Sequence, residues 1–110
     1  MHDSLWDHYD KLAIEALNQR RYTKASRLTK DALHRATLMC ELQPELVQRA
    51  DYLAKVHSDS GDYMSAAAIY RLILELQRAT LGSEHPDVEQ SSKVLLEALM
   101  NSGCITPGHA

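Results

Sequence analysis

The sequence matches itself when it is shifted by 41 or 42 residues. At a shift of 41, Tyr22 aligns with Tyr63, and at a shift of 42 the segment 43–48 aligns with the segment 85–90, with proline second in both. Because tyrosine and proline recur in register, a leucine-rich composition does not explain the match. Such a period is typical of proteins built from stacked repeats, in which each unit buries its apolar face against the next.

Each repeat is expected to form a pair of helices. Leucine and alanine dominate the apolar residues and favour helix, whereas the β-branched residues that favour strands are few. Pro44 and Pro86 suit the first turn of a helix, where the N–H that proline lacks would have no partner. Gly61, in the turn cluster 58–62, suits the left-handed residue that ends a helix. The helices are expected at about residues 3–19, 22–42, 44–60, 63–81 and 86–102.

These elements predict one all-α domain over residues 1–110. A single hairpin cannot bury its apolar stripe alone, so the hairpins are expected to stack. Small residues such as Ala25 and Ala54 alternate with large ones such as Leu53, as helix pairs about 8–10 Å apart require. The domain is expected to contain repeat one at about 3–43, repeat two at about 44–85, a capping helix at about 86–102 and a tail at 103–110.

The second repeat carries a set of recurring family positions, namely Leu53-Ala54, Gly61-Asp62-Tyr63, Ala66 and Tyr70. Their spacing resembles the tetratricopeptide (TPR) repeat, and the longer period is similar to the extended subtype of kinesin light chains and many bacterial TPR proteins. The resemblance extends over residues 5–103 and implies a right-handed α–α superhelix of two hairpins and a capping helix. The sequence departs from the family pattern at Arg20, which is usually glycine, at Thr29, which is usually aromatic, and at Ala50, which is often aromatic.

The resemblance also implies a non-catalytic module that binds a peptide or helix of a partner protein. The binding surface would be a concave groove lined by the first helix of each repeat. The candidate groove residues are Asp10, Ile14, Asp51, Tyr52, Lys55, Lys93 and Glu97. TPR proteins that capture a C-terminal carboxylate use lysine and asparagine at set groove positions, and only Lys93 matches here, so a carboxylate clamp is not expected. The alternative is that the groove positions are ordinary surface residues.

The expected helix at 86–102 is apolar over roughly 240° of its circumference, at about 100° per residue. A capping helix needs an apolar stripe of little more than about 100°. Large exposed apolar patches mark interfaces, so the surplus is expected to be covered. A second copy of the chain, a further repeat, or the segment 104–107 folding back could each cover it, and self-association through a two-fold contact is favoured. The self-association candidates are Val94, Leu95, Leu96, Leu99 and Met100.

No feature of the sequence indicates an enzyme, a cofactor or a metal site. The six histidines and two cysteines lack the spacing of zinc ligands. No carboxylate pair is placed in an apolar setting, and there is no nucleophile elbow or glycine-rich phosphate loop. With 12 Lys+Arg against 15 Asp+Glu, the net charge of −3 disfavours a nucleic-acid partner.

The chain is expected to be a cytoplasmic protein without a membrane partner. Its longest unbroken apolar run, residues 66–70, is far shorter than the roughly 20 residues needed to cross a bilayer. The first residues lack a basic segment followed by an apolar stretch, so no secretory signal is expected. Two isolated cysteines fit a reducing compartment.

Overall fold

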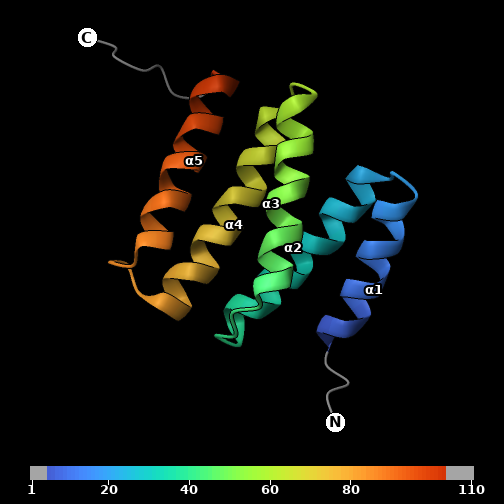
Figure 1. Cartoon of the computed structure of the whole chain (residues 1–110), viewed down its shortest axis with the longest axis horizontal. Helices are drawn as coiled ribbons and strands as arrows, with labels where there is room; N and C mark the ends of the chain where they lie inside the picture. The colour runs from blue at the N-terminus through green and yellow to red at the C-terminus, as the bar shows by residue number, and fades with distance from the viewer. Residues whose placement is uncertain (1–4, 104–110) are drawn as a thin grey trace.

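Five helices follow one another along residues 5–103, the part of the chain that the computed structural model describes (Figure 1). They are α1 (Leu5–Asn18), α2 (Tyr22–Leu38), α3 (Pro44–Asp59), α4 (Tyr63–Leu81) and α5 (Pro86–Ser102). The hairpins α1–α2 and α3–α4 are joined because α2 also packs on α3 and α4, and α5 packs on α4. The described residues contain no strand, so the all-α repeat fold is confirmed. The first two residues of the first expected helix and residues 104–110 of the expected tail lie outside the described residues.

The helix bounds agree with the expected ones to within two residues, except at the end of α2. We expected this helix to continue to residue 42, which is wrong, because α2 ends at Leu38. Cys40 has a φ of +53°, and the amide of Glu41 donates back to the carbonyl of Ala36 at 3.0 Å. This left-handed turn ends the helix, and residues 39–43 form the connection to α3.

A residue with a positive φ follows each of the five helices described. The residues are Arg20 after α1, Cys40 after α2, Gly61 after α3, Gly82 after α4 and Gly103 after α5, with φ of +59°, +53°, +87°, +90° and +86°. Arg20 and Gly61 are one repeat apart, and in both turns the next amide donates to the carbonyl five residues before it at 2.8 Å. The first hairpin therefore has the same turn as the second, formed without glycine.

Arg20→Gly is expected to raise the free energy of unfolding by about 1 kcal/mol. A residue with a Cβ atom pays about 1–2 kcal/mol for the left-handed conformation, which glycine adopts freely. The reverse change, Gly61→Arg, should lower the free energy of unfolding by a similar amount. No atom lies within 4 Å of a Cβ placed at Gly61, so the loss would come from backbone strain. Urea unfolding followed by circular dichroism measures both changes, and a destabilised Arg20→Gly variant would contradict the prediction.

The core follows the lines along which the helices cross. Its largest fully buried apolar side chains are Leu33, Leu46, Leu53, Ile69 and Leu76. Between them lie alanines that are fully buried, including Ala25, Ala54 and Ala66. The alternation of small and large residues predicted from the sequence is confirmed. Alanine allows two helix backbones to approach closely, and leucine fills the space beside the contact.

Two polar side chains join α2 to α3 within this core. Ser26 Oγ lies 2.7 Å from His57 Nε2, and the two residues are 5% and 8% exposed. Each satisfies a hydrogen-bonding group that the other would otherwise leave buried without a partner. One turn further along α2, the hydroxyl of Thr29 is buried with no hydrogen-bond partner, at a position where the family pattern has an aromatic residue.

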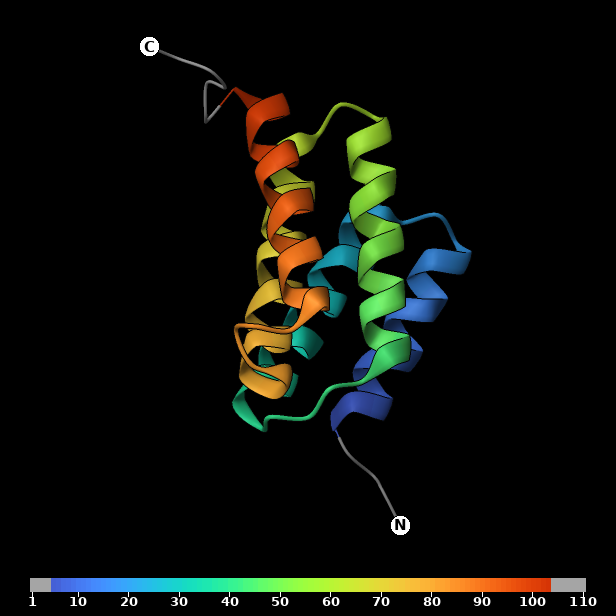
Figure 2. The same ribbon diagram turned by 60° about the vertical axis from the view of Figure 1, so that its left-hand side comes forward.

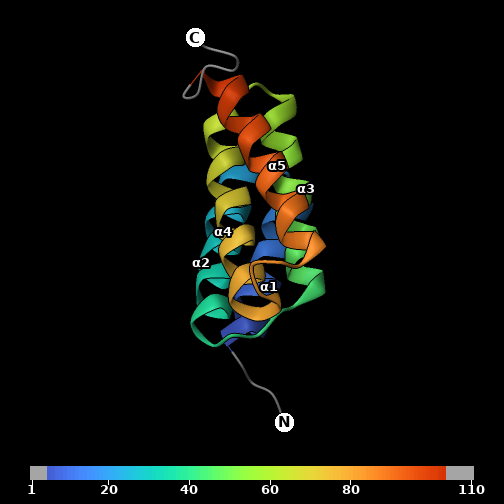
Figure 3. The same ribbon diagram turned by 90° about the vertical axis from the view of Figure 1, so that its left-hand side faces the viewer.

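The helices lie side by side in a slab that measures 55 × 34 × 16 Å (Figures 2 and 3). α2 and α4 lie along one side of the slab, and α3 and α5 lie along the other (Figure 3). α3 and α5 are therefore neighbours in one layer, with α4 packed against both. Among the described helices, none combines the length and the apolar character that a membrane crossing needs.

Candidate peptide-binding groove

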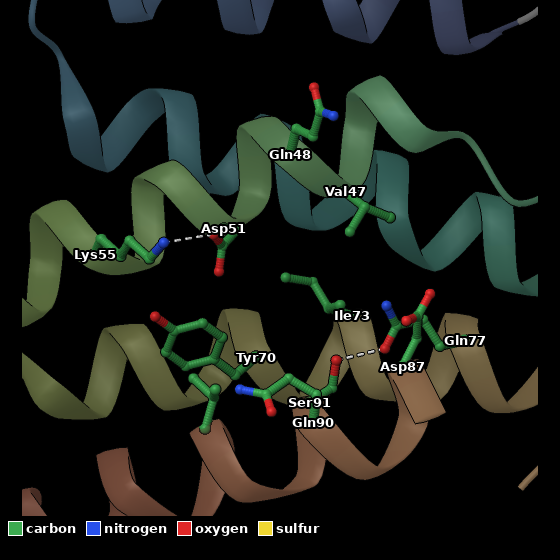
Figure 4. A pocket seen from close by; sticks show the side chains of 11 residues that line it. Val47, Gln48, Asp51, Lys55, Tyr70, Ile73, Gln77, Asp87, Gln90 and Ser91 are labelled. Carbon is green, nitrogen blue, oxygen red and sulfur yellow. Dashed lines mark hydrogen bonds and ion pairs between the residues drawn. The ribbon is translucent and has the colours of Figure 1, made fainter. Parts of the chain in front are cut away.

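An open cavity of about 450 Å³ lies between α3, α4 and α5, and is named here the inner groove (Figure 4). Its lining consists of Val47, Gln48, Asp51 and Lys55 from α3, Tyr70, Ile73 and Gln77 from α4, and Asp87, Gln90, Ser91 and Val94 from α5. On each helix most of these residues are three or four positions apart, the spacing that places side chains on one helix face. One stripe from each of three helices therefore faces the same space.

The floor of the inner groove comes from α4. Tyr70, Ile73 and Gln77 are 6%, 3% and 8% exposed. The hydroxyl of Ser91 donates a hydrogen bond to the amide oxygen of Gln77, which links α5 to α4 at the floor (Figure 4). A ligand can bury an apolar side chain against Ile73, while the polar side chains at the edges offer hydrogen bonds to its backbone.

Two carboxylates and one ammonium group line the inner groove, which gives its lining a net charge of −1. The Lys55 ammonium lies 3.0 Å from the Asp51 carboxylate, so the only cation among the described residues that line the groove is already paired. Burial raises the pKa of the Tyr70 phenol, and the negative charges of Asp51, Asp59 and Glu97 raise this pKa further. The negative charges near Tyr70 thus come from α3 and α5, the two helices on either side of the α4 floor.

Asp51 and Lys55 are the two predicted groove residues that line the inner groove. Tyr52 and Lys93 do not line it, and Tyr52 is 51% exposed on a neighbouring face of α3. Glu97 also lies outside the lining, although its charge acts on Tyr70. Of the predicted groove residues on α3 and α5, Asp51 and Lys55 therefore lie in the lining, and Tyr52, Lys93 and Glu97 lie outside it.

The two predicted groove residues on α1 lie away from this cavity. Asp10 accepts a hydrogen bond from Arg49 of α3 at 2.8 Å, and the side chains of this ion pair are 24% and 12% exposed. Ile14 is 41% exposed. The Asp10 carboxylate therefore ties the first hairpin to the second, and it is not a free carboxylate that a ligand could pair with.

The α4 floor is the part of the groove that sequence reasoning missed. The resemblance assigns the groove to the first helix of each repeat, so Tyr70, Ile73 and Gln77 were not predicted. A signal was present in the sequence, because Gln77 is a polar residue on an otherwise apolar face of α4. A buried amide at such a position indicates either a polar partner in the fold or an opening to solvent.

The self-association candidates on α5 point in two directions. Val94 lines the inner groove. Leu95 and Leu99 are partly buried against the core, and Leu96 is 46% exposed on the other side of the helix. Met100 is half-buried. The apolar surplus of this helix is thus divided between the inner groove and the opposite surface.

The pair Ser26–His57 lies close to a carboxylate, but the three groups are structural. Asp62 Oδ2 is 3.9 Å from His57 Nδ1, which is too long for a hydrogen bond. Instead, the Asp62 carboxylate accepts hydrogen bonds from the hydroxyl and the amide of Ser65 at 2.7 and 3.2 Å, and these bonds lower the pKa of Asp62. Ser26 is only 5% exposed, so a substrate could not reach its hydroxyl. Across residues 5–103 no group of three or more histidine, cysteine or acidic side chains could hold a metal ion.

Half of the chain's 12 lysines and arginines lie in or just before α2. They are Arg20, Arg21, Lys24, Arg27, Lys30 and Arg35. Asp31 is the one acidic residue in this stretch. The net charge of −3 is therefore unevenly distributed, with a basic helix α2 and an acidic surplus elsewhere, including the inner groove.

The fold and the groove define the class of this chain as a helical-repeat protein. The tetratricopeptide repeat family model matches residues 46–87, which span most of α3, all of α4 and the start of α5. This match and the fold together support a TPR-type repeat protein, and TPR domains generally bind protein partners. Comparison with curated proteins and with solved structures gave no match.

Proposed function

We propose that this chain is a non-catalytic interaction module that binds a peptide or helix of a partner protein in the inner groove. The observation that carries the proposal is an apolar floor and a carboxylate edge within one open cavity. The proposal includes the extended repeat subtype similar to kinesin light chains. It also includes a cytoplasmic, reducing setting, with which the exposed free thiol of Cys40 is compatible.

The ligand proposed is a segment with one apolar side chain flanked by lysine or arginine. Val47, Ile73 and Val94 come from three different helices and line one space, where an apolar anchor would lose its contact with water. Asp51 and Asp87 stand on the edges formed by α3 and α5. Their charges would attract cations on either side of the anchor and disfavour an acidic segment.

The test compares two short synthetic peptides by fluorescence anisotropy, one with leucine between lysines and one with leucine between glutamates. Wild-type protein should bind the lysine peptide more tightly by about tenfold or more, since like charges placed together are costly. The double variant Asp51→Lys/Asp87→Lys should reverse this preference. Circular dichroism checks that the variant keeps its helices.

Asp31→Lys is the control, because it makes one Asp→Lys change on α2, away from the inner groove, and adds +2 to the net charge where the double variant adds +4. The control variant should keep the wild-type preference. Equal binding of both peptides by wild-type protein, or binding of neither, would count against the proposed function. If Asp31→Lys changed the peptide preference as much as the groove variant does, the net charge of the protein, and not the groove, would select the peptide.

A second function, self-association, is favoured by one observation on the other side of α5. Leu96 is 46% exposed in a trough between α4 and α5 that Leu95 and Leu99 also line. Leucines gathered in this way on a surface mark an interface. Because this trough and the inner groove open on opposite sides of the α4–α5 contact, a self-associated chain could still bind a peptide.

A further inference from the structure

The trough between α4 and α5, named here the outer seam, is a surface on which another pair of helices could pack. It comprises two adjoining cavities of about 240 and 480 Å³. Their apolar lining is Met64, Ala67, Ala68, Leu74, Leu95, Leu96 and Leu99, and their polar lining is Arg71, Glu75, Arg78 and Ser92. The inner groove uses different faces of the same two helices. The outer seam is therefore a separate surface, in which leucines lie beside charged side chains.

The internal repeat shows what this surface lacks. A shift of 42 residues places Leu95, Leu96 and Leu99 on Leu53, Ala54 and His57 of α3. Those three residues are 0%, 0% and 8% exposed, because α3 is packed against both α2 and α4. Among the described helices, α4 is the main neighbour of α5, so one side of α5 keeps its apolar face uncovered. The three buried positions of α3 are thus leucines in α5, but among the described helices no second neighbour covers α5 as α2 and α4 cover α3.

Two of the three charged side chains that line the outer seam, all on α4, are opposite in charge and could pair with those of a second copy. Arg71 and Glu75 are one helical turn apart on α4, and they line the outer seam together with Leu95 and Leu96 of α5, which runs antiparallel to α4 (Figure 1). Within residues 5–103 neither side chain makes an ion pair. A two-fold axis through the seam at this level would bring Arg71 of one chain to Glu75 of the other, twice. The same axis would bring the two Leu96 side chains together.

We propose that the outer seam binds the outer seam of a second copy of this chain, in an antiparallel two-fold dimer closed by two reciprocal Arg71–Glu75 ion pairs. The proposal rests on the self-association function proposed above, and adds the surface and the charge pairs. In the dimer, α4 and α5 of each chain form a four-helix contact that covers the apolar faces of both. The two inner grooves remain open to peptides on the outside of this contact.

Charge exchange tests the proposal through measured mass, by light scattering behind size exclusion over a range of concentrations. Wild-type protein should have a mass of about 25 kDa, twice the 12.4 kDa of one chain. Arg71→Glu and Glu75→Arg should each weaken the dimer by about tenfold or more, since each places like charges together twice. A mixture of the two single variants should dimerise again, because both pairs are then opposite in charge.

The double variant Arg71→Glu/Glu75→Arg should likewise dimerise alone, and Lys24→Glu on α2 is the control for a change in charge away from the seam. Circular dichroism shows that each variant keeps its helices. A wild-type mass of one chain at every concentration would overturn both this proposal and the self-association function. If the single charge changes left the dimer intact, or if the mixture of the single variants stayed monomeric, only the proposed geometry of the outer seam would be overturned.

Discussion

Leu53→Ala is expected to lower the free energy of unfolding by about 2–5 kcal/mol, out of a total that is typically about 5–15 kcal/mol. Leu53 is fully buried on α3, the helix that packs against both α2 and α4. Its truncation would remove apolar contacts and leave a cavity that the surrounding helices could close only in part. Urea unfolding followed by circular dichroism gives the change directly.

Leu38→Ala is the matched control, because it removes the same atoms from a leucine that is 71% exposed at the end of α2. Its free energy of unfolding should stay within about 0.5 kcal/mol of the wild-type value. Losses of similar size at Leu53 and Leu38 would contradict the assignment of Leu53 to the core.

Ser26→Ala is expected to lower the free energy of unfolding by about 1–3 kcal/mol. The change removes few atoms, but it leaves Nε2 of the buried His57 without its partner at 2.7 Å. The cost therefore comes from desolvating an unpaired polar group, not from a cavity. The same urea titration measures it, with Ser83→Ala as a control for loss of an exposed serine hydroxyl.

A double-mutant cycle separates this hydrogen bond from the rest of the core. His57→Leu alone would leave the Ser26 hydroxyl unpaired, whereas Ser26→Ala/His57→Leu removes both polar partners from the same space. The double variant should lose less stability than the sum of the two single losses. Strictly additive losses would mean that the hydroxyl and the imidazole do not stabilise each other.

The positions of the helices could be predicted from the sequence because each boundary has a local physical cause. Pro44 and Pro86 begin helices, and Gly61 takes the left-handed conformation that ends one. The end of α2 could not be predicted in the same way. Cys40 adopts that conformation without being glycine, so its residue type does not mark the turn. Arg20 also takes a positive φ without being glycine, and its turn is indicated by its alignment with Gly61 one repeat later.

The inner groove could be predicted only in part, because its shape depends on how helices cross. Asp51 and Lys55 follow from the family pattern on α3, and the structure places both in the lining. Whether Val94 faces the groove or the opposite surface depends on the rotation of α5 about its axis, which its apolar circumference leaves undetermined. The pairing of Asp10 with Arg49 likewise depends on the approach of α1 to α3.

The two faces of the α4–α5 pair have a thermodynamic consequence. Tyr70 and Ile73 belong to the inner groove, while Arg71 and Leu74 on the intervening positions belong to the outer seam. Any displacement of α5 along α4 therefore alters both surfaces at once. If a peptide favours one displacement, it must strengthen or weaken the contact between two chains, and the contact must change the affinity for the peptide by the same factor. A helix pair with ligands on both sides is in this sense an allosteric element, with no separate domain needed to transmit the signal.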